Sequence, residues 1–434
     1  MIKNQIDIIT LGCSKNLVDS EQLLRQITAN GYTATHDPEK VEGEIVVVNT
    51  CGFIGDAKEE SINMILDLCE AKKSKQIGKV IVMGCLSERY LNDLEGELPE
   101  VDRFYGKFNW KELIADLGKV YRSDLQLERV VTTPPHFAYI KISEGCNRMC
   151  SYCAIPIITG RHQSRAIEDI VEEVRILVSE GVKEFQIIAQ DLSYYGLDLY
   201  KEMKLAELIE RISDVPGVEW IRLHYAYPAK FPYDVLRVMR ERDNVCKYLD
   251  IALQHVSDNQ LKMMRRHVNK QDTYDLLARI RKEVPSIHIR TTLMVGHPGE
   301  TDQDFEELMQ FVKDAKFERM GAFAYSEEDG THSAKAYTDD VDNQTKQDRL
   351  DAIMRIQERI AMASNDSKVG QTFKVMIDKK EGDYYVGRTE FDSPEVDPEV
   401  LISAKDHELT IGQFYQVNIT DAEPFELYGK VVKG

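Results

Sequence analysis

Short runs of β-branched and apolar residues alternate with amphipathic stretches along most of this chain. In the first part the runs are IDIIT, EIVVVNT and KVIVMG, and the stretches between them include DSEQLLRQITANGY and KEESINMILDLCEAKK. This alternation predicts a parallel sheet with helices on its faces, because parallel neighbours need a crossover connection. We therefore predict an open parallel α/β sheet over residues 1–125.

A proline pair, Pro134 and Pro135, interrupts this pattern and predicts a domain boundary near residue 130. Strand and helix patterns then resume, with helical stretches such as IEDIVEEVRILVSEG between the strands. The chemistry of such a barrel lies at the carboxyl ends of its strands. We predict a partial (β/α)6 barrel over residues 132–363, built on FAYIKIS, FQIIAQD, WIRLHYAYP, YLDIALQH, IHIRTTLMVG and RMGAFAYS.

The last segment, residues 366–434, carries short β patterns separated by Gly, Asp and Pro. The patterns are TFKVMID, YYVGRTE, QFYQVNIT and LYGKVV. They predict a small antiparallel β-barrel of the kind that binds oligonucleotides or peptides. Acidic side chains outnumber basic ones in this segment, which weighs against direct binding of nucleic acid.

The composition of the chain restricts its expected cellular compartment and the chemistry of its partners. Its formal charge of −19 over 434 residues suits a basic partner better than a phosphate backbone. No apolar run approaches the ~20 residues that cross a bilayer, and the first residues do not resemble a secretory signal. Eight cysteines in a reducing compartment favour metal or redox chemistry over disulfides. We expect a cytoplasmic monomer without a membrane span.

Three cysteines in SEGCNRMCSYCAIP form a C-x3-C-x2-C array: Cys146, Cys150 and Cys153. One interpretation is a zinc site, which needs a fourth ligand such as His162. The other is a 4Fe-4S cluster bound through three irons, whose fourth iron stays open for a ligand. The array follows the first predicted barrel strand and so lies at the catalytic mouth, which favours the cluster.

A second set of three cysteines follows the predicted amino-terminal strands: Cys13, Cys51 and Cys85. The carboxyl ends of parallel strands meet at one edge of a sheet, so these thiols are expected to converge. We predict that they bind a second cluster, again with one iron open. The two remaining cysteines, Cys69 and Cys246, fall in apolar patterns and are expected in the core.

The cysteine array on the loop after a first barrel strand resembles the radical S-adenosylmethionine (SAM) superfamily. The resemblance implies that the open iron binds the amino and carboxylate groups of SAM and that an electron from the cluster cleaves SAM to a 5′-deoxyadenosyl radical. With the amino-terminal cysteines and a TRAM-like terminal β domain, essentially the whole chain resembles the methylthiotransferase family. That family implies one 4Fe-4S cluster that carries or activates sulfur, a second that generates the radical, and two roles for SAM.

Polar residues recur where the predicted barrel strands end. Each of them could be an ordinary satisfied side chain at a strand terminus, but their repetition around one rim predicts that several line the SAM or substrate pocket. The candidates are Gln190, Asp191, His224, Gln254, Arg290 and Glu300.

The methylthiotransferase family acts either on tRNA adenosines, at the 2-position, or on the β-carbon of an aspartate in ribosomal small-subunit protein twelve. FAYSEEDGTHSA and GRTEFDSPEVDPEV resemble the ribosomal-protein branch, and an acidic surface would attract a basic ribosomal protein. The acidic run at 390–399 could also be a solvated loop. The chain departs from the family pattern at Ala252, where proline is common, and at His297, where an aromatic residue is common.

Two other functions remain open from the sequence. One is the tRNA-adenosine enzyme, and the other is a zinc-stabilised ribosome- or RNA-binding adaptor without catalysis. For the ribosomal-protein enzyme, we expect an electron donor such as flavodoxin or ferredoxin as a further partner.

Overall fold

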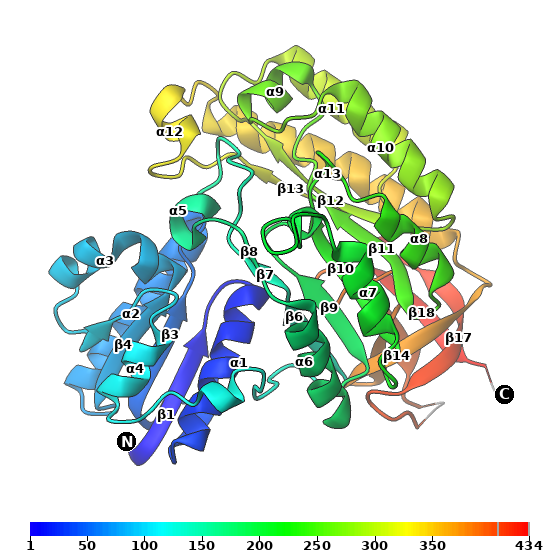
Figure 1. Cartoon of the computed structure of the whole chain (residues 1–434). Helices are drawn as coiled ribbons and strands as arrows, with labels where there is room; N and C mark the ends of the chain where they lie inside the picture. Colours follow the sequence, from blue (N-terminus) through cyan, green and yellow to red (C-terminus); the bar gives the residue numbers. More distant parts are fainter. Residues whose placement is uncertain (406–407, 433–434) are drawn as a thin grey trace. The chain divides into compact units, whose positions relative to one another are not determined.

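The first predicted sheet forms as a parallel sheet in the computed structural model, which describes residues 1–405 and 408–432. Its strand order is β2-β1-β3-β4-β5, and every neighbouring pair is parallel (Figure 1). The strands are β1 (Ile2–Thr10), β2 (Thr33–His36), β3 (Gly43–Thr50), β4 (Lys79–Gly84) and β5 (Arg103–Phe104).

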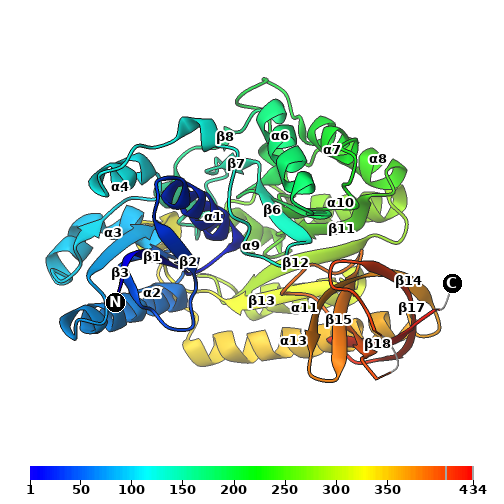
Figure 2. The same ribbon diagram turned by 90° about the horizontal axis from the view of Figure 1, so that it is seen from below.

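Helices cover both faces of this sheet, as crossover connections require. Helices α1 (Ser14–Ala29) and α4 (Trp110–Asp116) pack on one face, while α2 (Gly55–Lys73) and α3 (Cys85–Glu97) pack on the other (Figure 2). Strand β3 is therefore apolar on both sides, and its three consecutive valines are fully buried. Cys69 of α2 is buried in the same core, which confirms that prediction.

The chain divides into two compact units, which do not follow the order of the sequence. The first holds the amino-terminal sheet and also the segment that carries the C-x3-C-x2-C array. It consists of Met1–Thr133, Tyr139–Ile176 and Glu328–Lys335, and the second consists of Pro134–Ala138, Leu177–Glu327 and Ala336–Gly434.

Short elements complete the first unit. Strands β7 (Ser143–Glu144) and β8 (Gln163–Ser164) pair antiparallel and flank the cysteine array. Helix α5 (Ile155–Thr159) follows the array directly. Three further elements are divided between the units: β6 (Phe137–Lys141), α6 (Ile167–Ser179) and α12 (His332–Ala336).

The second unit contains five of the six predicted barrel strands. They are β9 (Glu184–Ile188), β10 (Trp220–Ala226), β11 (Val245–Ile251), β12 (His288–Val295) and β13 (Arg319–Ala324), and they pair in parallel in that order. The first barrel strand, β6, begins beside β9. The carbonyl of His136, just before β6, accepts hydrogen bonds from the amides of Lys183 and Glu184 at 2.9 and 3.0 Å. The six-stranded sheet stays open, which confirms the partial barrel.

Amphipathic helices lie along the outside of these strands (Figure 1). Helix α8, for example, turns Val235, Leu236, Val238 and Met239 inward. Cys246 of β11 is buried, as predicted. The helices are α7 (Leu205–Ser213), α8 (Asp234–Glu241), α9 (Asp258–Met263), α10 (Lys270–Glu283), α11 (Asp302–Ala315) and α13 (Asn343–Asp366), with a 3-10 turn, η2, at Leu192–Tyr194; η1 (Ser123–Leu125) belongs to the first unit.

The terminal segment closes into a five-stranded barrel of order β14-β15-β16-β18-β17. The predicted small β-barrel is confirmed, although the sequence patterns missed one of its strands, β16. Four of its five strand pairs are antiparallel, and β16 pairs with β18 in parallel. The missed strand is short and follows a proline-containing acidic stretch. The strands are β14 (Thr372–Glu381), β15 (Tyr384–Thr389), β16 (Glu399–Ser403), β17 (Phe414–Ala422) and β18 (Glu426–Val431).

The acidic run at 390–399 is only partly a solvated surface. Asp392 is fully buried and accepts hydrogen bonds from Arg319 at 2.5 and 3.1 Å. Asp397 pairs with Arg290 at 2.8 Å. These two carboxylates therefore neutralise arginines of barrel strands within the second unit and are not available to attract a basic partner. No helix among the described residues is long and apolar enough to span a membrane.

Candidate functional site

The amino-terminal cysteines come together at the carboxyl edge of the first sheet. Cys13 caps α1, Cys51 directly follows β3, and Cys85 begins α3 directly after β4. A Cβ atom added to Gly12 would lie 3.0 Å from the Cys51 sulfur, and the Cys85 sulfur lies 3.6 Å from Asn16 Oδ1. The three loops that carry the cysteines are thus in mutual contact.

Asn16 holds two of these loops in place. Its side-chain amide donates to the Leu11 carbonyl at 3.0 Å and to the Thr50 carbonyl at 3.1 Å, and its backbone amide donates to the Cys13 carbonyl at 2.9 Å. The residue is buried, so these contacts are shielded from water. Asn16 therefore fixes the loop after β1 against the end of β3.

The glycine before Cys85 is required by the backbone. Gly84 has a φ of 105°, and a Cβ atom there would lie 2.6 Å from the backbone of Thr50. Gly52 follows Cys51, and a Cβ atom on it would lie 2.7 Å from the backbone of Leu86. Both glycines allow neighbouring cysteine loops to approach closely.

A buried lysine lies beside this cysteine triplet. Lys107 Nζ is 3.3 Å from Asp19 Oδ2 and 3.7 Å from Glu144 Oε1. Lys141 donates to the same two carboxylates, to Asp19 by a short hydrogen bond and to Glu144 at 2.9 Å. The two lysines and two acids form one network inside the first unit, from α1 to the strand that precedes the C-x3-C-x2-C array.

The surroundings of the three amino-terminal thiols shift their pKa values in different directions. The residue Cys13 is exposed, but partial desolvation of its sulfur opposes ionisation; Lys15, the Asn16 amide and Lys107 outweigh this and lower the pKa of the thiol. Burial raises the pKa of Cys51, and it raises the pKa of Cys85 to about 12. Lys107 favours the thiolate at all three positions.

The C-x3-C-x2-C array forms a tight loop between β7 and α5. The Cys146 amide donates to the Gly160 carbonyl at 3.1 Å, and the Cys153 amide donates to the Cys150 carbonyl at 3.2 Å. The Arg148 amide points at the Cys146 sulfur from 3.5 Å, a contact that favours a thiolate. The three cysteines are half-buried, so they are accessible to a cluster and partly shielded from water.

Both triplets belong to the first unit. Cys85 packs in one apolar cluster with Ala154, which follows Cys153, and with Ile158 of α5.

His162, the candidate fourth zinc ligand, has its Nε2 3.1 Å from Ser164 Oγ. Among residues 1–405 and 408–432, no group of three His, Cys, Asp or Glu side chains is gathered closely enough for a single metal ion. A 4Fe-4S cluster spreads its ligands more widely, because each thiolate binds a different iron. Each triplet supplies three cysteine thiols, which is the donor chemistry of a 4Fe-4S cluster with one iron left open.

The polar residues predicted on the barrel rim belong to the second unit and divide into two groups. Gln190 and Asp191 follow β9, and Asp191 caps η2 by accepting from the Ser193 amide at 2.9 Å. His224 lies near the end of β10, with Nε2 2.7 Å from Gln186 Oε1. Gln254 follows β11 with a φ of 70°. Its buried Oε1 has no hydrogen-bond partner among the described residues, as expected of an atom that receives a ligand.

The other two rim candidates are engaged in protein contacts. Glu300 accepts from the Gly296 amide at 2.6 Å, from Arg349 at 2.7 Å and from His255 at 3.0 Å. Arg290 is near the beginning of β12, not at its carboxyl end, and it pairs with Asp397. The expectation that Arg290 lies on the rim is therefore wrong, because its run continues for five more strand residues, to Val295.

Sequence reasoning did not identify the network around the amino-terminal triplet. Asn16 follows Cys13 by one helical turn, which is a weak signal for a neighbouring residue. Lys107 and Asp19 are ordinary charged residues in the sequence, and only the fold brings them together.

Family models match all three parts of the chain. The radical SAM superfamily matches residues 140–312, Uncharacterized protein family UPF0004 matches residues 5–106, and the TRAM domain matches residues 369–432.

Curated relatives match the chain over nearly its whole length. The ribosomal protein uS12 methylthiotransferase RimO of Parabacteroides distasonis is 70% identical over 432 residues, which cover 100% of both chains. The proteins of the same name from Porphyromonas gingivalis and Cytophaga hutchinsonii are 63% and 50% identical, and the match covers at least 98% of each chain.

Solved structures share the fold at low identity. The radical S-adenosylmethionine methyltransferase TsrM of Kitasatospora setae matches with a TM-score of 0.57 at 13% identity, over 77% of both chains. The cobalamin-dependent S-adenosylmethionine radical enzyme OxsB matches with a TM-score of 0.53 at 12% identity, over 82% of this chain and 56% of its own.

Proposed function

The chain belongs to the RimO family of ribosomal protein uS12 methylthiotransferases, and from this membership we propose that it adds a methylthio group to the β-carbon of an aspartate in ribosomal small-subunit protein twelve. It is a radical SAM enzyme. The observation that carries the proposal is the full-length identity to relatives of that name, together with two cysteine triplets in one unit.

We propose that Cys13, Cys51 and Cys85 bind one 4Fe-4S cluster and that Cys146, Cys150 and Cys153 bind the other. The fit of both donor sets supports this assignment. When bound, the clusters and SAM would supply the electron, the radical, the methyl group and the activated sulfur needed to convert an unactivated C–H bond into C–SCH3. A thiolate alone cannot attack such a bond, because its hydrogen is not acidic.

The residues of the chain have positioning and electrostatic roles in this proposal. Lys107 offsets the negative charge of the amino-terminal thiolates, and Asn16 keeps two of their loops together. Gln254 is proposed to bind SAM through its buried amide oxygen, since that oxygen accepts no hydrogen bond from the described residues. Gln190, Asp191 and His224 are proposed to line the rest of the pocket, and Glu300 to hold the loop after β12.

Other properties follow as part of the same proposal. The domains are proposed to be 1–125 for the cluster-bearing sheet, 132–363 for the radical SAM core and 366–434 for the TRAM-like barrel. The partners are the ribosomal protein and an electron donor such as flavodoxin or ferredoxin. The enzyme is proposed to act as a monomer in the cytoplasm, where ribosomal proteins are found.

The reaction is tested with the anaerobically reconstituted enzyme, SAM, reductant and a peptide that carries the target loop of protein twelve. We expect a gain of about 46 Da on one aspartate, the mass of one sulfur and one CH2 group. Cleavage of SAM without modification of the peptide or of assembled small subunits would contradict the assignment of protein twelve as the substrate. Modification of tRNA adenosine under the same conditions would identify the tRNA branch instead.

The two-cluster assignment is tested by removing each triplet separately. Replacing Cys13, Cys51 and Cys85 by alanine should remove roughly half of the bound iron and leave SAM cleavage in place. Replacing Cys146, Cys150 and Cys153 should remove the other half and abolish SAM cleavage. The matched control replaces Cys69 and Cys246, which are buried in apolar cores, and should leave the iron content unchanged. If the purified protein contained zinc in place of iron, this would support the zinc-stabilised adaptor without catalysis.

A further inference from the structure

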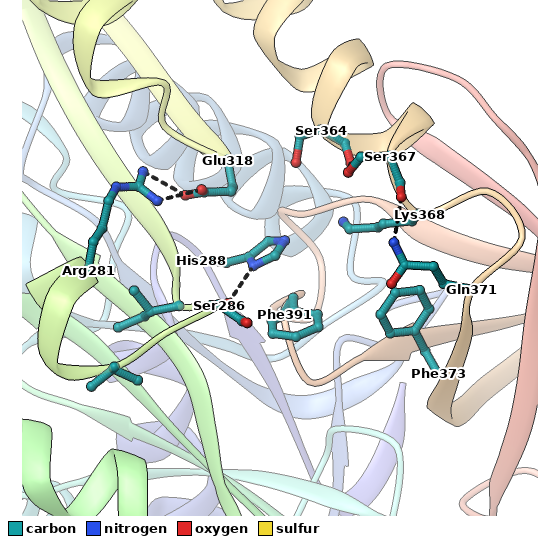
Figure 3. Close-up of a pocket in the computed structure, with 12 residues that line it drawn as sticks. Arg281, Ser286, His288, Glu318, Ser364, Ser367, Lys368, Gln371, Phe373 and Phe391 are labelled. Carbon is teal, nitrogen blue, oxygen red and sulfur yellow. Dashed lines mark hydrogen bonds and ion pairs between the residues drawn. The ribbon is translucent and has the colours of Figure 1, made fainter.

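A cavity of about 400 Å³ lies in the second unit, at the amino-terminal ends of β12 and β13 (Figure 3). Its walls come from α10, the starts of β12 and β13, the end of α13, the start of β14 and the loop after β15. The carboxyl ends of the barrel strands, where the proposed reaction takes place, are at the opposite end of these strands. The cavity is therefore separate from the proposed reaction site.

Lys368 brings a buried positive charge into this cavity. The residue is 4% exposed, and its ammonium group has a hydrogen-bond partner in Asn365 Oδ1 at 3.3 Å. No carboxylate of the described residues approaches it within ion-pair distance. Burial lowers the pKa of Lys368 to about 8, so the side chain is still charged at neutral pH but poorly stabilised.

The nearby acids do not neutralise Lys368, because each is engaged elsewhere. Asp392 accepts two hydrogen bonds from Arg319, at 2.5 and 3.1 Å. Glu318 accepts two from Arg281, at 2.7 and 3.2 Å, as Figure 3 shows. Among residues 1–405 and 408–432, no carboxylate therefore forms an ion pair with Lys368 in this cavity.

The ring of His288 provides a hydrogen-bond acceptor in the wall of this cavity. Its Nδ1 lies 3.3 Å from the Ser286 carbonyl oxygen, and since a carbonyl can only accept, Nδ1 carries the proton. The other ring nitrogen, Nε2, then presents a lone pair. It is buried without a hydrogen-bond partner among the described residues and faces the Lys368 ammonium group in Figure 3.

Two further features keep His288 in this state. Its ring stacks on Phe391, with centroids 4.1 Å apart and an interplanar angle of 23°, so its orientation is fixed. Burial and the nearby Lys368 lower the pKa of His288 to about 3, so the ring is neutral at physiological pH. The cavity thus offers one cationic donor and one neutral acceptor.

We propose that this cavity binds inorganic phosphate, with Lys368 donating to an anionic oxygen and His288 Nε2 accepting a hydrogen bond from a protonated oxygen. At neutral pH inorganic phosphate retains a hydroxyl group and carries negative charge, so it satisfies both side chains. Sulfate has the same shape but no proton, so its oxygen would face the His288 lone pair. The site should therefore distinguish the two ions.

The proposal is independent of the methylthiotransferase reaction and is tested by binding alone. Holoenzyme in a buffer without phosphate or sulfate is titrated anaerobically with each ion by calorimetry. We expect one phosphate per chain, with sulfate about ten-fold to a hundred-fold weaker, the effect of one hydrogen bond to a charged group. No phosphate binding, or equal affinity for both ions, would overturn the proposal.

Variants assign the binding to this cavity. Lys368→Met keeps the aliphatic stem and should weaken phosphate at least about ten-fold. His288→Phe keeps the stacked ring and should abolish the preference for phosphate over sulfate. Lys430→Met, on an exposed position of the same terminal barrel, is the matched control and should change neither. Unchanged phosphate binding by the first two variants would place the ion elsewhere. If they do not fold, the comparison of the two ions on the unaltered enzyme still decides the question.

Discussion

Arg388 donates hydrogen bonds to both carboxylate oxygens of Glu184, at 3.0 and 2.8 Å, and both side chains are buried. Glu184 begins barrel strand β9, whereas Arg388 lies in β15 of the terminal barrel. Arg222 also donates to Glu184 at 3.1 Å, and Arg388 also pairs with Asp378 at 2.6 Å. The terminal barrel is thus joined to the core of the second unit through a buried charge network.

Removing Arg388 should destabilise the protein strongly. Arg388→Met leaves Asp378 without its arginine and Glu184 with Arg222 alone, so buried carboxylates lose their compensation. We expect the free energy of unfolding of the second unit to fall by about 3–5 kcal/mol, measured by urea denaturation. Lys379→Met, which removes an exposed cation from β14, is the control and should cost less than about 1 kcal/mol. Equal losses in the two variants would contradict the role of the network.

The same network should make stability sensitive to acid. Burial alone would raise the pKa of Asp378, but Arg388 and the hydrogen bond from His136 lower it to about 2, from an ordinary value of 3.8. A carboxylate with a lowered pKa stabilises the fold above its unfolded pKa, and that contribution disappears as the pH falls from about 4 to about 2.

The test compares the unaltered protein with Asp378→Asn across this pH range. The difference in unfolding free energy should be constant above about pH 5 and should shrink by about 2–3 kcal/mol below pH 4. Asp383→Asn, at an exposed site in the same hairpin, is the control. A difference that does not change with pH would show that Asp378 does not titrate as described.

The sequence predicted the parts of the molecule that follow from periodicity. The convergence of Cys13, Cys51 and Cys85 follows from their places after parallel strands, because such strands end at one edge of a sheet. The partial barrel and the terminal barrel follow from repeated β patterns. These are local signals, and the structure preserves them.

The sequence could not predict which distant charges meet. Lys107 and Asp19 are far apart along the chain, and no pattern marks them as partners. Asp392 and Asp397 lie in an acidic run typical of a solvated loop, yet they pair with arginines of the barrel strands. Nor does any pattern indicate that residues 139–176 group with the amino-terminal sheet. Such pairings depend on tertiary packing alone.

Two rim residues should respond differently to mutation. Gln254→Met removes a buried acceptor that has no hydrogen-bond partner in the part of the chain that the structure describes, so it should weaken SAM binding while the free energy of unfolding changes by less than about 1 kcal/mol. Glu300→Gln disturbs a carboxylate that accepts from Arg349 and His255, so it should lower stability by about 1–3 kcal/mol. Equilibrium dialysis with SAM and urea denaturation separate the two effects. If Gln254→Met instead lowered stability and Glu300→Gln instead weakened SAM binding, the roles assigned to the two residues would be exchanged.

Lys107 should control how readily the amino-terminal triplet binds iron. Cys51 and Cys85 have raised thiol pKa values, and they must lose their protons before they bind metal. Lys107→Met removes the buried cation that favours these thiolates and leaves Asp19 and Glu144 nearby, so ionisation becomes harder. The variant should therefore need a more alkaline pH to take up iron, and at neutral pH it should lose up to roughly half of its iron, while SAM cleavage by the other cluster persists. Lys111→Met, on the exposed face of α4, is the control. Iron uptake by Lys107→Met with an unchanged pH profile would show that the network around Lys107 supports the fold but not the cluster.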